Sequence, residues 1–192
     1  MGRTAKGRAA IKSALLSLMH EKPFAEISVS EICELAGVSR TTYYRNYYAQ
    51  SDVLDDILDD CFGEAEELQG NMSAVDPVSY EIDLGQQVAI YQMLLHIREH
   101  VQELVVILWS EKASVLERRI RAMAKRGLGI AQGTCPTDPH EYLYQEYTVA
   151  GMTRITCAWI QGNCEIPIEQ MLSFEVDAAR ALATMEPSKL GV

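Results

Sequence analysis

The chain has 192 residues, 48% hydrophobic and 23% charged, which is ordinary for a globular protein of one or two domains. No apolar run reaches the eighteen or so residues of a membrane span, and the first ten residues lack the apolar core of a signal peptide. We therefore expect a cytoplasmic protein without a membrane partner. Its five cysteines form no CxxC pair and no zinc-spaced cluster, so buried free thiols are favoured and neither a metal nor a cofactor is expected.

The net charge of −10 is distributed unevenly along the chain. Residues 1–50 hold seven Lys/Arg and four Asp/Glu, a net charge of +3, which leaves ten bases and twenty-three acids, a net charge of −13, for the remainder. The first twenty residues contain four bases and no acid. Only this end of the chain suits a polyanion such as DNA, although a solvated basic tail would have the same composition.

Three short helices are predicted in the first fifty residues. The first runs from about residue 5 to 20, where apolar residues recur at helical spacing and Pro23 follows. The second begins after Ser28, which can form a capping box with Glu31. Its expected apolar stripe consists of Val29, Ile32, Leu35 and Ala36.

A sharp turn and a third helix follow at once. Gly37 permits the positive φ of a tight helix exit, and Ser39 can cap the next helix. In that helix Tyr43 and Tyr47 share one face and are expected to pack inward. Thr41, Tyr44 and Arg45 would lie on the opposite face, with Arg40 and Asn46 at its edges. The pattern is that of a helix-turn-helix, with a plain structural helix pair as the alternative.

The remaining residues are also predicted to be helical, with no strand alternation. A helix over about 51–68 would link the first domain, residues 1–50, to a second domain over 51–192. The capping signal Asp138-Pro139 and the glycine Gly162 bound one of the longest helices. Polar loops are expected over 70–80 and 133–137, and the other helices over about 83–100, 101–109, 110–127, 138–162 and from 167 onward. The fold class is therefore all-α: a three-helix head and a larger helical bundle, about nine helices in total.

The segment from Ile27 to Leu54 resembles the DNA-binding domain of the TetR family of transcriptional regulators. The resemblance is carried by Ile27-Ser28-Val29, Ala36-Gly37-Val38-Ser39, Thr42-Tyr43-Tyr44, Tyr47 and Val53-Leu54, and it extends over about residues 6–60. It departs from the family pattern at two positions: Gln50 replaces the usual phosphate-binding lysine, and Tyr47 replaces phenylalanine, so the Tyr47 hydroxyl must find a partner.

The resemblance implies a set of DNA-binding residues. Thr42 and Tyr44 match positions that contact the backbone of DNA, whereas Arg40, Thr41, Arg45 and Asn46 match those nearest the bases. The full predicted set consists of Arg3, Lys6, Ser30, Ser39, Arg40, Thr41, Thr42, Tyr44, Arg45, Asn46 and Gln50.

The second domain is expected to bind an effector and to dimerise, as in relatives of this family. The candidate pocket residues are Tyr91, Met93, His96, His100, Trp109, Tyr144, Tyr147 and Met152, and the candidate dimer residues are Ile155, Ala158, Trp159, Phe174, Ala178 and Leu182. Ordinary packing inside one chain is the alternative for both sets. His96 and His100 stand one helical turn apart near Glu99 and Glu103, a spacing that could hold a metal, although polar side chains that face solvent without a metal explain the pattern better.

These expectations converge on a sequence-specific transcriptional regulator. We expect a homodimeric repressor that binds a palindromic operator in double-stranded DNA and is released by an unidentified small-molecule effector. An enzyme is disfavoured, because the chain has no GxSxG, GxGxxG, P-loop or HExxH motif. A helical protein-interaction module, or a non-classical activator with weak DNA binding, is the alternative.

Overall fold

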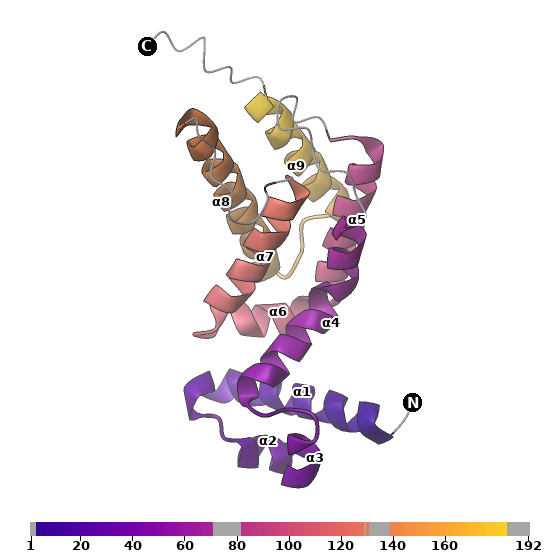
Figure 1. Cartoon of the computed structure of the whole chain (residues 1–192), viewed down its shortest axis with the longest axis vertical. Helices are drawn as coiled ribbons and strands as arrows, with labels where there is room; N and C mark the ends of the chain where they lie inside the picture. Colours follow the sequence, from indigo (N-terminus) through magenta and orange to yellow (C-terminus); the bar gives the residue numbers. More distant parts are fainter. Residues whose placement is uncertain (1–2, 71–81, 129, 131–138, 184–192) are drawn as a thin grey trace. The chain divides into compact units, whose positions relative to one another are not determined.

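The chain folds into helices throughout the part that the structure describes. The structure is a computed structural model that describes residues 3–70, 82–128, 130 and 139–183. Within those ranges it has nine α-helices, one 3-10 helix and no strand, which confirms the predicted all-α class (Figure 1). The elements are α1 (Arg3–Glu21), η1 (Phe24–Glu26), α2 (Val29–Leu35), α3 (Arg40–Tyr44), α4 (Gln50–Gly70), α5 (Leu84–Glu99), α6 (Val101–Leu108), α7 (Ala113–Gly127), α8 (Pro139–Gln161) and α9 (Ile168–Ala183).

The chain divides into two compact units. The first unit consists of residues 1–63 and 102–116, and the second unit of residues 64–101 and 117–192. Helices α4 and α7 therefore each contribute residues to both units. The division into functional domains at residue 50 stays a prediction, because compactness groups residues by packing and not by function.

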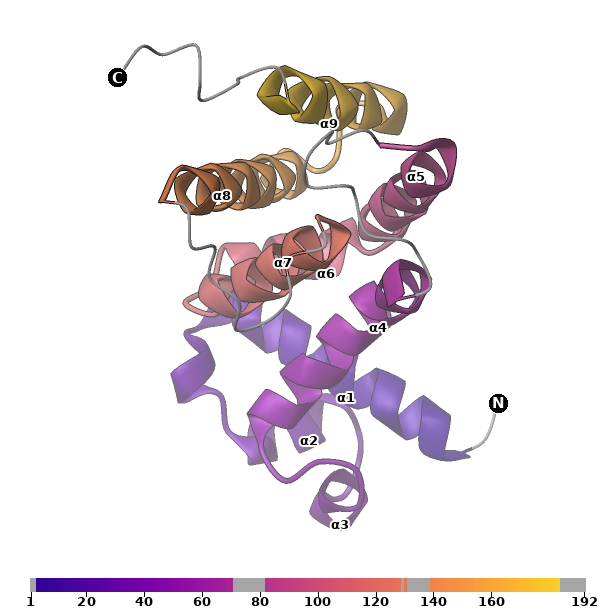
Figure 2. The same cartoon turned by 45° about the horizontal axis from the view of Figure 1, so that its top comes forward.

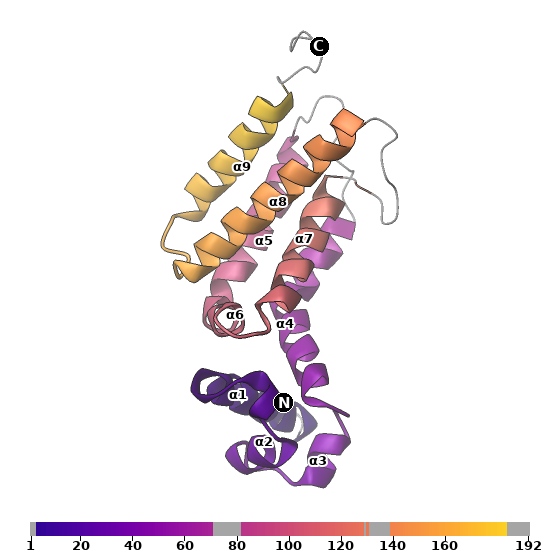
Figure 3. The ribbon, with the colours of Figure 1, turned by 90° about the vertical axis from the view of Figure 1, so that its left-hand side faces the viewer.

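The helix-turn-helix predicted in the first unit has the expected local geometry. Ser28 and Glu31 form a capping box at the start of α2, Gly37 has φ +64°, and the Ser39 hydroxyl accepts the Thr42 N–H at the start of α3. The hydroxyls and carboxylates of such caps satisfy N–H groups that a helix leaves unpaired at its beginning. Figure 3 shows α2 and α3 on either side of this turn, beneath α1.

The apolar stripe of α2 differs from the prediction at one position. Leu35 is 55% exposed, whereas Ile32 and Cys33 are buried. The reason is geometric: α2 ends at Leu35 and the chain then turns at Gly37, so the last residue of the helix lies beyond the surface that packs on α1. The expectation for Leu35 was wrong, and Cys33 takes its place in the core.

A short element between α1 and α2 was not predicted. Pro23 ends the preceding segment as expected, and η1 then forms a single turn in which the Ile27 N–H donates to the Phe24 carbonyl over 3.2 Å. Phe24 is buried, and the ammonium of Lys112 lies 4.4 Å from its ring centroid. The adjacent Ala25 N–H donates to the Glu111 carboxylate over 3.1 Å, so η1 is held by the turn between α6 and α7.

In the second unit α9 packs along α5 (Figure 2). The buried residues Leu94 and Ile97 of α5 and Ile168 and Met171 of α9 supply its apolar core. Burial of such side chains contributes about 1.5–3 kcal/mol each and accounts for most of the stability of a helical unit. The connection between α8 and α9 is fixed by Trp159, whose indole N–H donates to the Ile166 carbonyl over 2.9 Å.

Two helix ends differ from the sequence-based boundaries. Gly162 follows α8 as expected, but the left-handed residues are the next two, Asn163 with φ 55° and Cys164 with φ 53°. Helix α7 begins at Ala113 and not at Ser110, because the Ser110 hydroxyl caps the intervening turn by accepting the Lys112 N–H over 3.0 Å.

Several expectations concern residues that lie outside the described ranges: the two polar loops, the Asp138 cap and Cys135. The other four cysteines, Cys33, Cys61, Cys157 and Cys164, are buried free thiols as predicted. None of the helices in the described ranges has the length and apolar character needed to cross a membrane.

Candidate nucleic-acid interface

The side chains of α3 separate into a buried and an exposed set. Tyr43 and Tyr47 are buried, as predicted from their spacing of four residues. Arg40, Thr41 and Tyr44 are exposed, and so is Arg45, which ends the helix. The Tyr44 ring stands edge-on to the Tyr43 ring with centroids 5.5 Å apart, so packing against a core residue orients an exposed aromatic side chain.

Hydrogen bonds inside the helix-turn-helix engage several of the predicted DNA-binding residues. The Arg40 guanidinium donates to the Ser30 hydroxyl, which joins α3 to the first turn of α2. The Asn46 amide donates to the Thr42 carbonyl over 2.8 Å, and the hydroxyls of Ser39 and Thr42 lie 2.9 Å apart. Thr41 of α3 and Arg45, which follows the helix, are exposed, and their side chains are in none of these hydrogen bonds.

Gln50 stands at the start of α4, where the sequence resemblance implies a phosphate-binding lysine. Its side-chain amide donates to the backbone carbonyl of Ile27, so the residue ties the start of α4 to the strand-like segment before α2. The bond to the Ile27 carbonyl uses one proton of the Gln50 amide, and the Gln50 side chain is uncharged. Gln50 thus contributes to the internal structure of the first unit, and its predicted contact with DNA stays a prediction.

Three of the seven Lys and Arg side chains described in the first unit lie in ion pairs. Arg8 and Lys12 of α1 pair with Asp56 of α4, Lys12 also pairs with Asp60, and Lys22 pairs with Glu31. The hydrogen bonds from Lys22 and Ser28 lower the pKa of Glu31 to about 2, which keeps this carboxylate ionised. The net positive charge counted from the sequence therefore overstates the charge available to a polyanion.

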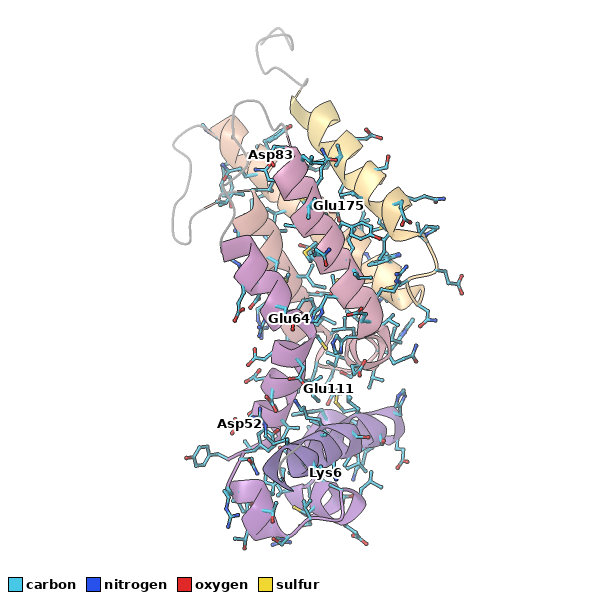
Figure 4. The ribbon with its side chains drawn as sticks, turned by 90° about the vertical axis from the view of Figure 1, so that its right-hand side faces the viewer. Lys6, Asp52, Glu64, Asp83, Glu111 and Glu175 are labelled. Atoms are coloured by element: carbon cyan, nitrogen blue, oxygen red, sulfur yellow. The ribbon has the colours of Figure 1, made fainter. Side chains whose placement is uncertain are left out.

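Four basic side chains described in the first unit, those of Lys6, Arg40, Arg45 and Lys112, lie outside these ion pairs. Lys6 and Arg45 form no ion pair with a described residue, and both are exposed. Figure 4 shows Lys6 on α1. Arg3 begins α1, but its side chain lies outside the description. Arg40 is exposed although it also contacts Ser30.

Asp56 is the centre of a network that joins α1, α3 and α4. The Tyr47 hydroxyl donates to Asp56 Oδ2 over 2.5 Å, Arg8 Nε lies 3.3 Å from the same oxygen, and Lys12 Nζ lies 3.2 Å from it. Burial opposes ionisation of Asp56, but these three donors outweigh it and hold its pKa below the usual value. Asp56 is therefore the hydrogen-bond partner that the sequence analysis required for the Tyr47 hydroxyl.

The loop between α3 and α4 presents a residue that the sequence analysis did not single out. Tyr48 is 90% exposed, while its backbone N–H donates to the Asp52 carboxylate over 2.7 Å. The Ala49 N–H donates to the same oxygen over 3.1 Å, and these two bonds lower the pKa of Asp52. Figure 4 shows where Asp52 lies on α4. The signal in the sequence was the spacing, since Tyr48 falls outside the inward-facing pair Tyr43 and Tyr47.

The predicted effector residues do not all lie in the interior of the second unit. Six of them are half-buried there: Tyr91, Met93, His96, His100, Tyr144 and Met152. Tyr147 is 72% exposed, and Trp109 is 73% exposed and belongs to the first unit, so neither side chain lines that interior. A helix has one buried face, and spacing alone did not separate the two faces of α8.

The histidine pair of α5 is close but forms no metal site with other described residues. The rings of His96 and His100 are 4.9 Å apart, and His96 Nδ1 lies 3.7 Å from Glu99. No three His, Cys, Asp or Glu side chains are grouped as metal ligands anywhere in the described ranges.

The predicted dimer residues also divide between surface and interior. Ala158 and Phe174 are exposed, whereas Ile155 and Ala178 are half-buried, and the Leu182 side chain lies outside the description. Trp159 is only 3% exposed and bonds within its own chain, so its side chain belongs to the core of the second unit. Packing inside one chain, which the sequence left open, explains this residue.

A buried carboxyl group in α9 was missed. Glu175 is 6% exposed, and its Oε2 has no hydrogen-bond partner among the described residues. Burial raises the pKa of Glu175 to about 7. The sequence carried a signal, because Ile168, Met171 and Glu175 follow one another at the spacing of a single helix face.

The fold is that of TetR-family transcriptional regulators. No protein-family profile and no curated protein matches the sequence. Among solved structures, a TetR transcriptional regulator from Streptococcus agalactiae 2603V is 18% identical, with a TM-score of 0.60 over 92% of this chain and 95% of its own. The dihydroxyacetone kinase operon activator DhaS is 20% identical, with a TM-score of 0.56 over 91% of this chain and 94% of its own.

Proposed function

We propose that the protein is a sequence-specific DNA-binding transcriptional regulator that acts as a homodimer. The observation that carries the proposal is the exposed face of α3, which presents Thr41, Tyr44 and Arg45 after a glycine turn and a serine cap. A short helix with such side chains fits the major groove, where they reach base edges and phosphates. The fold shared with TetR-family regulators supports the same function.

The affinity for DNA should depend weakly on salt for a protein of this class. Each contact between a Lys or Arg side chain and a DNA phosphate makes the slope of log K against log salt concentration more negative by about 0.9. Arg8, Lys12 and Lys22 are neutralised by acids of the same chain, and Gln50 adds no charge. The remaining contacts, from Lys6, Arg40 and Arg45, give a small slope for each half-site.

Two copies are needed because one α3 reads only a few base pairs. A symmetric dimer would place two such helices about 34 Å apart, or at a related spacing, on a palindromic operator. The exposed faces of α8 and α9 supply apolar residues for a contact between copies, since Leu143, Tyr147 and Phe174 are 63%, 72% and 50% exposed. Ala158 lies on the same exposed face of α8 and permits close approach.

We further propose that a small molecule bound in the second unit changes operator affinity. Helices α4 and α7 each contribute residues to both units, so a ligand that contacts their residues in the second unit acts on helices that the first unit shares. In the first unit the turn before α7 holds η1 through Glu111 and Lys112, which gives a second connection to the segment before α2. An effector acts in this way only if its affinity differs between the two arrangements.

The function is tested by selecting bound fragments from random duplex DNA with the full chain. We expect the selected fragments to share a palindromic sequence. The affinity of the protein for that sequence is then measured by fluorescence anisotropy. Arg45→Ala and Tyr44→Ala should each weaken binding about tenfold or more, since a base or phosphate contact is worth about 1–3 kcal/mol. Arg118→Ala, which removes an exposed arginine of α7, is the matched control and should leave binding unchanged.

Two results would contradict the regulator. One is the absence of any enriched sequence, and the other is equal binding by the wild type and both α3 variants. Arg40→Ala is less suitable, because Arg40 also holds Ser30 of α2.

A repressor released by its effector is the form of regulation that we favour, with an activator as the second candidate. The specific observation for the activator is the structural similarity to DhaS, which is named as an operon activator. Transcription from the selected operator, placed upstream of a reporter in vitro, distinguishes the two by its direction of change when the protein is added.

A further inference from the structure

Apart from tyrosines and cysteines, the buried polar and charged side chains that the structure describes lie in the second unit. They are Gln86, Thr148, Thr156 and Glu175, from helices α5, α8 and α9. A polar group in the interior of a helical bundle costs free energy unless it is hydrogen-bonded. Where such groups persist in an apolar interior, a binding site is the first explanation to consider.

Three of these four side chains are bonded locally. The Gln86 side-chain carbonyl accepts the Asp83 N–H over 2.8 Å as part of a capping box. The hydroxyls of Thr148 and Thr156 each donate to the backbone carbonyl four residues earlier, over 2.9 Å. Their burial is therefore explained by the helices that carry them.

Glu175 is the exception. It follows Ile168 and Met171 on the buried face of α9, and Figure 4 shows it between α9 and α5. Its Oε2 is buried and has no hydrogen-bond partner in the described part of the chain. Burial raises the pKa of this carboxyl group to about 7, and no charged side chain in the described ranges adds to or opposes that effect.

Most charged side chains that the structure describes on α5, α8 and α9 are exposed or contact other residues. On α5, Arg98 and Glu99 are exposed, His96 lies near Glu99, and Asp83 caps the start of the helix. On α8, Arg154 is exposed and Glu146 pairs with Arg121 and Lys125 of α7. On α9 itself, Glu169 and Asp177 are exposed. The described residues thus supply no cation to the Glu175 carboxylate.

We propose that Glu175 binds the ammonium group of a small-molecule ligand whose apolar body lies in the interior of the second unit. A buried carboxylate without a counter-charge gains strongly from a cation, because both charges interact in a medium of low dielectric constant. Ile168 and Met171, which are buried on the same face of α9 as Glu175, suit the hydrocarbon part of such a ligand. The inference rests on the proposed function in one respect, namely that an effector enters the second unit.

The test uses the full chain without DNA and measures melting temperature and calorimetric binding at pH 8. The probes are hexylammonium and benzylammonium, each compared with its neutral match, hexanol and benzyl alcohol. At least one ammonium probe should raise the melting temperature saturably, while its alcohol should not. Glu175→Gln should abolish the rise, whereas Glu169→Gln, an exposed acid at the start of the same helix, should preserve it.

The pH dependence of binding provides a further readout. An alkylammonium group stays charged between pH 6 and pH 8, whereas a carboxyl group with a pKa near 7 goes from about one-tenth to about nine-tenths ionised. The association constant should therefore rise about tenfold over this range in the wild type and in Glu169→Gln.

The proposal is overturned if neither ammonium probe stabilises the protein more than its alcohol, or if Glu175→Gln binds the probe as the wild type does. It is also overturned if Glu175→Gln instead changes the monomer–dimer constant in sedimentation, because the carboxylate would then belong to a contact between copies. If the protein still binds its operator but one of these results is obtained, the ligand site is rejected and the regulator is not. Loss of operator selection by the wild type rejects the regulator and leaves the ammonium measurement valid.

Discussion

Two buried tyrosines of the helix-turn-helix should respond in opposite ways to loss of their hydroxyl groups. The Tyr43 hydroxyl is buried and has no partner among the described residues, whereas the Tyr47 hydroxyl donates to Asp56 over 2.5 Å. An unpaired buried polar group costs about 1–3 kcal/mol, and a hydrogen bond to a charged group contributes about 1.5–3 kcal/mol. Tyr43→Phe should therefore stabilise the protein by about 1 kcal/mol, and Tyr47→Phe should destabilise it by about 2 kcal/mol.

The two effects are measured by thermal denaturation followed by circular dichroism, at fixed pH and protein concentration. For a chain of this size, 1 kcal/mol corresponds to about 2–4 °C in melting temperature. Tyr43→Phe should raise the midpoint by about 2–4 °C, and Tyr47→Phe should lower it by about 4–8 °C. Tyr44→Phe is the matched control, since Tyr44 is 53% exposed and its change should be near zero. Equal destabilisation by Tyr43→Phe and Tyr47→Phe would refute the reasoning from hydroxyl partners.

Three further predictions concern charge. The pKa of Glu175 is raised from 4.5 to about 7, so the folded state retains a proton that the unfolded state loses, and stability should fall by about 3 kcal/mol as pH rises from about 4.5 to 7. Glu175→Gln should remove that fall in urea titrations across pH, and an unchanged slope would contradict it. Asp56→Asn should destabilise the protein by about 2 kcal/mol at pH 7. Asp60→Asn, at a more exposed position, should destabilise it by less than about 1 kcal/mol. Equal melting temperatures of the two variants would count against the network around Asp56. Gln50→Lys should increase DNA affinity about tenfold and steepen its salt dependence by about one unit for each half-site, and a flat response would show that no phosphate lies near.

The sequence predicted those features of the first unit that depend on near neighbours. The capping box of Ser28 and Glu31, the turn at Gly37 and the inward pair Tyr43 and Tyr47 each involve residues within four positions of one another. Local hydrogen bonding and backbone sterics determine such features, so they can be predicted from the local sequence. The partner of the Tyr47 hydroxyl was required by the sequence but not identified by it.

Features that join distant segments could not be predicted. Arg8 and Asp56 are separated by 48 residues, and nothing in their local sequence distinguishes an ion-paired arginine from one that faces DNA. Leu35 was assigned to the core because the spacing fits, yet the end of α2 leaves it exposed. The same uncertainty about orientation placed Tyr147 in a pocket and overlooked Glu175, since helix periodicity gives the angle of a face but not which face is covered.

The discontinuity of the first unit has a consequence for synthesis on the ribosome. Residues 1–63 emerge before residues 102–116, which complete the packing around η1 through Glu111 and Lys112. At about 5–20 residues per second, the intervening stretch of roughly fifty residues delays completion by about 3–10 seconds. During that interval the nascent head lacks part of its own unit, so a nascent chain arrested once residue 63 has emerged should be cleaved by protease faster than one arrested once residue 116 has emerged.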